Sequence, residues 1–141
     1  MQVQDSPDPG GRPKIRGAPT GLILLVEDDF VLRTSLSELL TEEGFRVECC
    51  ADGREAYRRL HNPPKPDLIM LDIMLPHLDG FELRALQRKS PFIASIPVVV
   101  ISAHDLDPRT FMELELSLPF RKPLDIDLLL STVRDRLVPQ T

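Results

Sequence analysis

The sequence predicts an α/β fold, a doubly wound five-stranded parallel sheet with helices on both faces. Apolar runs of strand length alternate with segments of helical periodicity after residue 20. The third run, Asp67 to Leu71, is apolar after its first residue, as expected for a strand buried on both faces. Because crossovers between parallel strands are right-handed, this alternation places helices on both sides of one sheet.

Two strand and helix pairs are predicted in the first half of the folded region. A strand at Leu22 to Val26 precedes an amphipathic helix that Gly44 ends. A second strand, Phe45 to Cys50, precedes a short helix from about Arg54 to His61. The apolar face of the first helix carries Leu32, Leu36, Leu39 and Leu40.

The second half continues the alternation. A helix from Gly80 to about Arg88 should bury Phe81 and Leu86, and Val98 to Ile101 forms the most apolar strand. Asp107 and Pro108 have the residue types of an N-cap and a first helical position.

The end of the folded region is predicted to hold a minimal strand and one more helix. The fifth strand is very short, with prolines at 119 and 123, so it belongs at a sheet edge. The last helix begins near Asp125 and should pack a row of apolar residues, namely Ile126, Leu129, Leu130, Val133 and Leu137.

Length and composition indicate one domain. The 141 residues are 42% hydrophobic, enough for a single core. Residues 1–20 contain four prolines and three glycines, so we expect a disordered arm there and a folded domain over 21–138.

Charge and hydropathy exclude several classes. The net charge is -5 and no Lys/Arg-rich run appears, which disfavours direct nucleic-acid binding. No apolar stretch reaches the roughly 20 residues of a membrane span, and no signal peptide is recognisable, so we expect a cytoplasmic protein that does not contact a membrane. The adjacent Cys49 and Cys50 are predicted to be buried thiols.

Reactive side chains recur where the predicted strands end. In a doubly wound sheet, ligands bind beyond the carboxyl ends of the strands. The first strand ends in Glu27-Asp28-Asp29, the third in Asp72, the fourth in Ser102 and the fifth in Lys122. We therefore expect these groups to converge on one edge of the sheet.

Such a cluster suits phosphoryl chemistry with a divalent cation. Crowded carboxylates raise one another's pKa unless a cation compensates them, and oxygen ligands favour Mg²⁺ over zinc. Lys122 and Ser102 would contact phosphoryl oxygens, which leaves Asp72 as the nucleophile that forms an acyl phosphate. Asp28 or Asp29 could instead cap the first helix, and we expect Asp29 to be the cap.

Residues 21 to 137 resemble the receiver domain of two-component response regulators. The matching segments are Leu24 to Asp29, Pro66 to Pro76 with Asp79-Gly80, Pro97 to Ala103, and Lys122-Pro123. The resemblance implies a flavodoxin-like (βα)5 fold with strand order 2-1-3-4-5, and a Lys122-Pro123 bond that is commonly cis.

The same resemblance implies a role for each site residue. Glu27 and Asp28 correspond to the acidic pair that holds Mg²⁺ together with Asp72, the phosphoacceptor, and Met74 corresponds to the position that supplies a backbone carbonyl. Ser102 corresponds to the switch hydroxyl and Lys122 to the phosphate-pairing lysine. His104 is at a position that influences the lifetime of the phosphoryl group.

By this resemblance, the chain is a signalling phosphoacceptor that catalyses only its own phosphorylation and dephosphorylation. The phosphoryl group would come from a phosphohistidine on a histidine kinase or phosphotransfer protein. The face formed by the fourth helix, fifth strand and fifth helix would bind a downstream protein.

One region departs from the receiver pattern. Pro119 occupies the usual place of a switch aromatic residue, three positions before Lys122, and Phe120 is one place later. This departure allows a second interpretation, in which the chain is a receiver-fold interaction module that no longer switches by phosphorylation. A haloacid-dehalogenase-like phosphatase is disfavoured, because Met74 stands where its second acid is needed.

Overall fold

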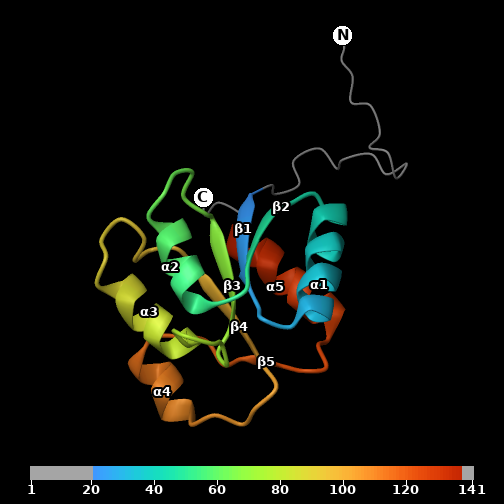
Figure 1. Cartoon of the computed structure of the whole chain (residues 1–141). Coiled ribbons are helices and arrows are strands. Elements are labelled where there is room, and N and C mark those ends of the chain that lie inside the picture. The colour runs from blue at the N-terminus through green and yellow to red at the C-terminus, as the bar shows by residue number, and fades with distance from the viewer. Residues whose placement is uncertain (1–20, 138–141) are drawn as a thin grey trace.

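The computed structural model, which describes residues 21–137, confirms the predicted α/β fold (Figure 1). Five parallel strands form one sheet in the order β2-β1-β3-β4-β5, which is the predicted order. The arm expected over residues 1–20 lies outside the described residues. Along the chain, the elements are β1 (Leu22–Val26), α1 (Phe30–Glu42), β2 (Arg46–Cys50), α2 (Gly53–Leu60), β3 (Leu68–Asp72), α3 (Gly80–Arg88), β4 (Val98–Ser102), α4 (Pro108–Glu113), β5 (Phe120–Arg121) and α5 (Ile126–Leu137).

Helices cover both faces of the sheet. Helices α1 and α5 lie on one face, and α2, α3 and α4 lie on the other (Figure 1). Alternate side chains of each central strand enter the two cores: in β4, Val98 and Val100 face the α2–α4 layer, whereas Val99 and Ile101 face the α1–α5 layer. Every residue of β1, β3 and β4 is buried, which explains why these strands are so apolar.

Aspartates cap the N-termini of α1, α2, α3 and α4. The Asp29 carboxylate accepts from the backbone N–H groups of Val31 and Leu32, which confirms it as the cap of α1. Asp107 caps α4 in front of Pro108, as predicted. At α3, Asp79 and Glu82 form a reciprocal capping box. Because Asp29 is engaged as a cap, Glu27 and Asp28 are left for other contacts.

The fifth strand is short and lies at the edge of the sheet, as its flanking prolines predicted. β5 has two residues and pairs only with the end of β4, through Ile101 and Ser102. The Lys122-Pro123 peptide bond that follows is cis, and so is Pro63-Pro64. This short edge strand positions Lys122 directly beyond the sheet.

Burial was predicted wrongly for four residues, two of them in α3. In α3, Phe81 and Leu86 are only half-buried, and the buried side chains are Leu83, Arg84 and Gln87. The two polar residues are buried because backbone carbonyls outside α3 accept their hydrogen bonds, that of Leu114 from Arg84 and that of Ile93 from Gln87.

The other two wrong predictions concern sheet and helix margins. Ile126 stays 36% exposed because it is the first residue of α5, ahead of the turns that pack on the sheet. Cys49 is exposed, unlike Cys50, because it lies on the edge strand β2.

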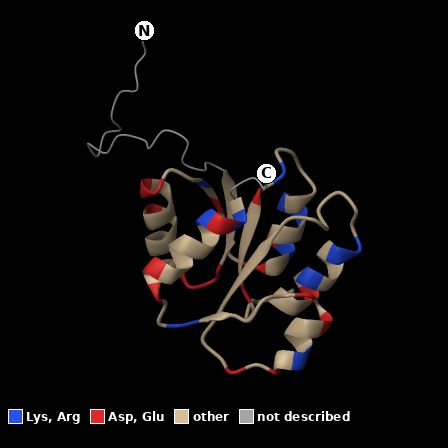
Figure 2. Ribbon diagram, turned by 180° about the vertical axis from the view of Figure 1, so that it is seen from behind, with Lys and Arg blue, Asp and Glu red and all other residues tan. Residues whose placement is uncertain are grey.

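Acidic and basic residues are interspersed over the helices of the described region (Figure 2). Helix α2, for example, carries Glu55 among Arg54, Arg58 and Arg59. Within residues 21–137, no helix is long and apolar enough to cross a membrane.

Candidate functional site

The predicted site residues meet at the carboxyl edge of the sheet. Glu27 directly follows β1, Asp72 ends β3, Ser102 ends β4, and Lys122 directly follows β5. The register brings the strand ends level, because Asp72 is opposite Ile101 and Ser102 is opposite Arg121. Four segments that are far apart in sequence therefore present their polar residues at one edge.

Three carboxylates form a cluster that suits a hard cation. Glu27, Asp28 and Asp72 each offer an oxygen, and these oxygens lie within 4.8 Å of one another. Glu27 is fully buried and Asp72 is 3% exposed, whereas Asp28 is exposed. A cluster made only of oxygen ligands, with one side open to water, fits Mg²⁺, which usually keeps several waters.

Lys122 neutralises part of this negative charge. Its ammonium nitrogen lies 2.9 Å from Oε1 of Glu27 and 3.3 Å from Oδ2 of Asp72. Burial lowers the pKa of Lys122, but the hydrogen bond to Glu27 and the charges of Asp72 and Glu27 outweigh this and raise it above its ordinary value. Lys122 is therefore a firmly charged partner of both acids.

The ionised form of Glu27 is disfavoured by its burial. Burial raises the pKa of its carboxyl above 4.5, although hydrogen bonds from Lys122 and from the backbone N–H of Asp29 oppose this. The charge of Asp72 raises the pKa further. A second cation close to the cluster would favour ionised Glu27, which agrees with a metal site.

Ser102 is buried beside the same edge. Its Oγ accepts a hydrogen bond from the backbone N–H of His104 at 3.1 Å and donates to the His104 carbonyl at 3.3 Å. The backbone N–H of Lys122 donates to the Ser102 carbonyl at 2.9 Å. Ser102 therefore links the loop after β4 to the loop after β5, while the His104 side chain is exposed.

A tight loop from Asp72 to Gly80 completes the site. Oδ1 of Asp72 accepts from the backbone N–H of Met74 at 3.3 Å, and the N–H of Gly80 donates to the Ile73 carbonyl at 2.8 Å. A Cβ at position 80 would lie 2.7 Å from both the Asp72 carbonyl oxygen and Cα of Ile73. Only glycine fits at this point without shifting the backbone of Asp72.

Sequence reasoning missed two contributors to the site. Gly80 was predicted only as a helix start, and nothing in the pattern shows how closely it approaches Asp72. Arg33 was not singled out, yet its guanidinium donates to the Glu27 carbonyl at 2.8 Å. A signal was present, because Arg33 is one helical turn after the Asp29 cap and so returns to the start of α1.

Phe120 does not lie beside Ser102. It packs with the core between the sheet and helices α1 and α5, as Ile101 does. Because strand neighbours alternate, Ser102 faces the opposite side of the sheet. The described structure thus gives Phe120 a place in the α1–α5 core, away from the face of the buried hydroxyl.

Comparisons with known proteins agree with this geometry. The family model described as "Response regulator receiver domain" matches residues 23–134. The alkaline phosphatase synthesis transcriptional regulatory protein SphR of Synechococcus elongatus is 36% identical over 107 residues, which cover 70% of this chain and 41% of SphR. The chain spans less than half the length of the first curated relatives that it matches.

Solved structures give the same result. The receiver domain of the Francisella response regulator 1452 is similar with a TM-score of 0.74 and 28% identity, covering 83% of this chain and 96% of that one. The signal receiver domain of a histidine kinase from Syntrophus aciditrophicus has a TM-score of 0.72 and 33% identity, covering 84% and 89%. The chain belongs to the receiver domain family of two-component response regulators.

Proposed function

We propose that this receiver domain accepts a phosphoryl group on Asp72, with Mg²⁺ held by Glu27, Asp28, Asp72 and the backbone carbonyl of Met74. The observation that carries the proposal is the contact of Lys122 with both Glu27 and Asp72 beside three clustered carboxylates. Phosphorylation and Mg²⁺ binding are general to receiver domains.

In the proposed reaction, a carboxylate oxygen of Asp72 attacks the phosphorus of a phosphohistidine on a partner. A phosphorus–oxygen bond forms, the phosphorus–nitrogen bond breaks, and the imidazole leaves. The product is an acyl phosphate on Asp72. Mg²⁺, when bound, would offset the negative charge of the phosphoryl oxygens.

Lys122 and Ser102 would stabilise the transferred group. Lys122 now contacts carboxylate oxygens at 2.9 and 3.3 Å, and a phosphoryl oxygen would become a further anionic acceptor for its ammonium. The Ser102 hydroxyl would exchange its bonds with His104 for a bond to a phosphoryl oxygen. This exchange would pull on the loop after β4 and so convert phosphorylation into a conformational change.

The partners follow from the family. We propose a histidine kinase or phosphotransfer protein as donor, and a downstream protein that binds the face formed by α4, β5 and α5. Several of the matched relatives are named as transcriptional regulatory proteins, and these are longer than this chain. That this chain itself makes no contact with nucleic acid stays a prediction.

Labelling with a small phosphodonor tests the proposal. Incubation with acetyl phosphate and Mg²⁺ should add the mass of one phosphoryl group to the intact protein. The same incubation should leave an Asp72→Asn variant unlabelled, and circular dichroism should show that this variant is folded. A folded wild-type protein that gains no mass would count against phosphoacceptor activity.

A receiver-fold module that signals only through protein contacts is the second candidate. The location of Phe120 in the α1–α5 core favours it, because no aromatic side chain of β5 lies on the Ser102 face. Amide chemical shifts recorded before and after labelling separate the two candidates. A switching receiver would show shifts in α4 and β5, whereas shifts confined to the loops around Asp72 would favour the module.

A further inference from the structure

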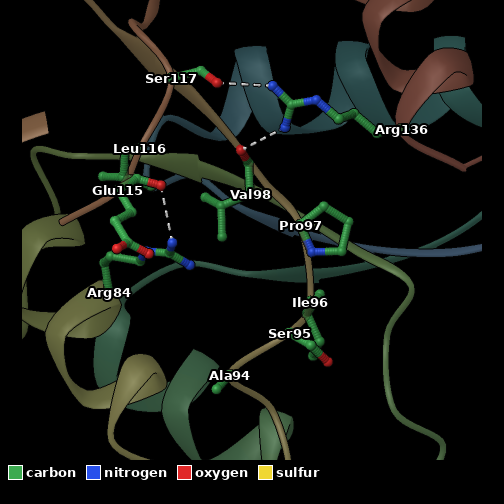
Figure 3. A pocket seen from close by; sticks show the side chains of 10 residues that line it. All are labelled: Arg84, Ala94, Ser95, Ile96, Pro97, Val98, Glu115, Leu116, Ser117 and Arg136. Carbon is green, nitrogen blue, oxygen red and sulfur yellow. Dashed lines mark hydrogen bonds between the residues drawn. The ribbon is translucent and has the colours of Figure 1, made fainter. Parts of the chain in front are cut away.

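A polar pocket lies at the amino-terminal ends of β4 and β5, away from the carboxylate site. It has a volume of about 180 Å³ and is lined by the loop that precedes β4, the connection from α4 to β5, and side chains of α3 and α5 (Figure 3). Val98, at its wall, begins the strand that Ser102 ends, so about 13 Å of strand separates the pocket from the carboxylate site. None of its lining residues belongs to that site.

Arg84 of α3 is a buried cation in this pocket. The residue is 9% exposed, and its guanidinium donates to the carbonyls of Leu114 and Glu115 at 2.9 and 3.1 Å and to Oε1 of Gln87 at 2.9 Å. All three acceptors are neutral. Among the described residues, no carboxylate lies within 4.0 Å of this guanidinium. Burial and the charge of Arg88 lower the pKa of Arg84, and the more distant charge of Glu115 opposes this only in part.

Arg136 of α5 enters the same pocket from another side (Figure 3). It donates to the carbonyl of Val98 at 3.2 Å and to Oγ of Ser117 at 2.9 Å, again to neutral acceptors. Glu115 also lines the pocket, but its carboxylate lies 3.5 Å from Arg88. Within residues 21–137, neither Arg84 nor Arg136 forms an ion pair.

Both guanidinium groups keep donors for a ligand. Of the five N–H donors of an arginine, three of Arg84 and two of Arg136 are used by the described residues. A buried cation that contacts no anion directly is costly, and a guanidinium pairs well with the oxygens of a carboxylate or phosphate. The two arginines of the pocket face one carboxylate, that of Glu115, so the lining keeps an excess of positive charge that a further anion could offset.

We propose that this pocket is a binding site for a small oxyanion, a phosphate or carboxylate group held between Arg84 and Arg136. The volume equals the share of about six water molecules in the liquid, which suits one such group with a few waters. Because Arg84 also holds the carbonyls of Leu114 and Glu115, a bound anion would contact the α4–β5 connection through it. The proposal does not depend on phosphorylation of Asp72.

Titration of the full chain by nuclear magnetic resonance tests the site. Inorganic phosphate is added without Mg²⁺, with sodium chloride at equal ionic strength as the reference, and acetate is titrated separately. We expect saturable shifts of the Val98 and Ser117 amides with at least one anion, and the tighter anion identifies the ligand class. Shifts that do not saturate, or that appear only near Asp72 and Lys122, would overturn the proposal.

Variants assign the effect to the pocket. Arg136→Gln should weaken binding about tenfold or more, because a charge-assisted hydrogen bond is lost. Arg136→Lys keeps the charge without the fork of donors and should be intermediate, which covers the case of a Gln variant that does not fold. Arg109→Gln, an exposed site with the same loss of charge, is the matched control and should bind like the wild type. Wild-type affinity in a folded Arg136→Gln protein would contradict the site.

Discussion

The ammonium of Lys122 lies 2.9 Å from Oε1 of Glu27, and the two residues are 95 positions apart in the sequence. The same ammonium is 3.3 Å from Oδ2 of Asp72. One cation therefore joins the loops after β1, β3 and β5 at the carboxyl edge of the sheet. This arrangement makes Lys122 both a structural counter-ion and, in our account, the contact for a transferred phosphoryl group.

Replacement of Lys122 by alanine should lower the free energy of unfolding of the metal-free protein by about 2 kcal/mol. The substitution leaves two buried carboxylates without their cation, and the loss is smaller than for a fully buried pair because Lys122 is partly exposed. Added Mg²⁺ should recover more stability in this variant than in the wild type. Denaturant titrations with and without Mg²⁺ measure both effects.

The same variant tests the role of Lys122 in switching. We expect acetyl phosphate to label Lys122→Ala, but the amide shifts in α4 and β5 that accompany labelling should be lost. Lys122→Arg keeps a charge and is the matched control. Full shifts in the alanine variant would remove Lys122 from the switch.

Glu27→Gln should weaken Mg²⁺ binding by at least about tenfold, because a carboxylate ligand becomes a neutral amide of the same shape. The metal-free variant should be more stable than the wild type at neutral pH, because the raised pKa of Glu27 means that its ionised form is disfavoured on folding. Calorimetric Mg²⁺ titration and thermal unfolding give the two results. Asp28→Asn should also weaken binding, without this gain in stability, because Asp28 is exposed.

Mg²⁺ affinity should rise with pH above 4.5. The folded-state pKa of Glu27 is raised, so the metal-free protein keeps this proton above 4.5 and Mg²⁺ must displace it. The contribution of Glu27 to stability is full below 4.5 and is lost as pH rises through the raised pKa. Titrations at several pH values should show this rise in the wild type, and a smaller one in Glu27→Gln.

Gly80→Ala should cost about 2 kcal/mol of stability and slow the labelling of Asp72, because the added methyl would lie 2.7 Å from backbone atoms of Asp72 and Ile73. Gly44→Ala is the control. Gly44 has a φ of 103° and open space around it, so alanine there should cost about 1 kcal/mol by backbone strain. Labelling at the wild-type rate in Gly80→Ala would contradict the tight-loop account.

The sheet was predictable from the sequence because its central strands β1, β3 and β4 are short apolar runs bounded by polar or proline residues. The apolar run Val98 to Ile101 and the edge position of Phe120 and Arg121 follow from local pattern. The buried face of α3 was not predictable, because Arg84 and Gln87 are buried only through carbonyls of Leu114 and Ile93 in other segments. A helical pattern does not contain that information.

The sequence predicts which residues form the site, but it does not predict the contacts between them. The rule that ligands bind at the carboxyl ends of parallel strands selects Glu27, Asp72, Ser102 and Lys122 from the order of residues along the chain. The contact between Lys122 and Glu27 depends on the register of β5 at the sheet edge, which two residues of strand do not specify. The close approach of Gly80 to Asp72 depends on the path of a loop.

The most direct measurement of the central proposal is the identity of the labelled residue. After incubation with acetyl phosphate and Mg²⁺, borohydride reduction converts an aspartyl phosphate to homoserine, which peptide mass spectrometry can locate. We predict homoserine at position 72 alone, and none without the phosphodonor. Modification at another carboxylate, or a folded wild-type protein that carries no acyl phosphate at Asp72, would contradict the account.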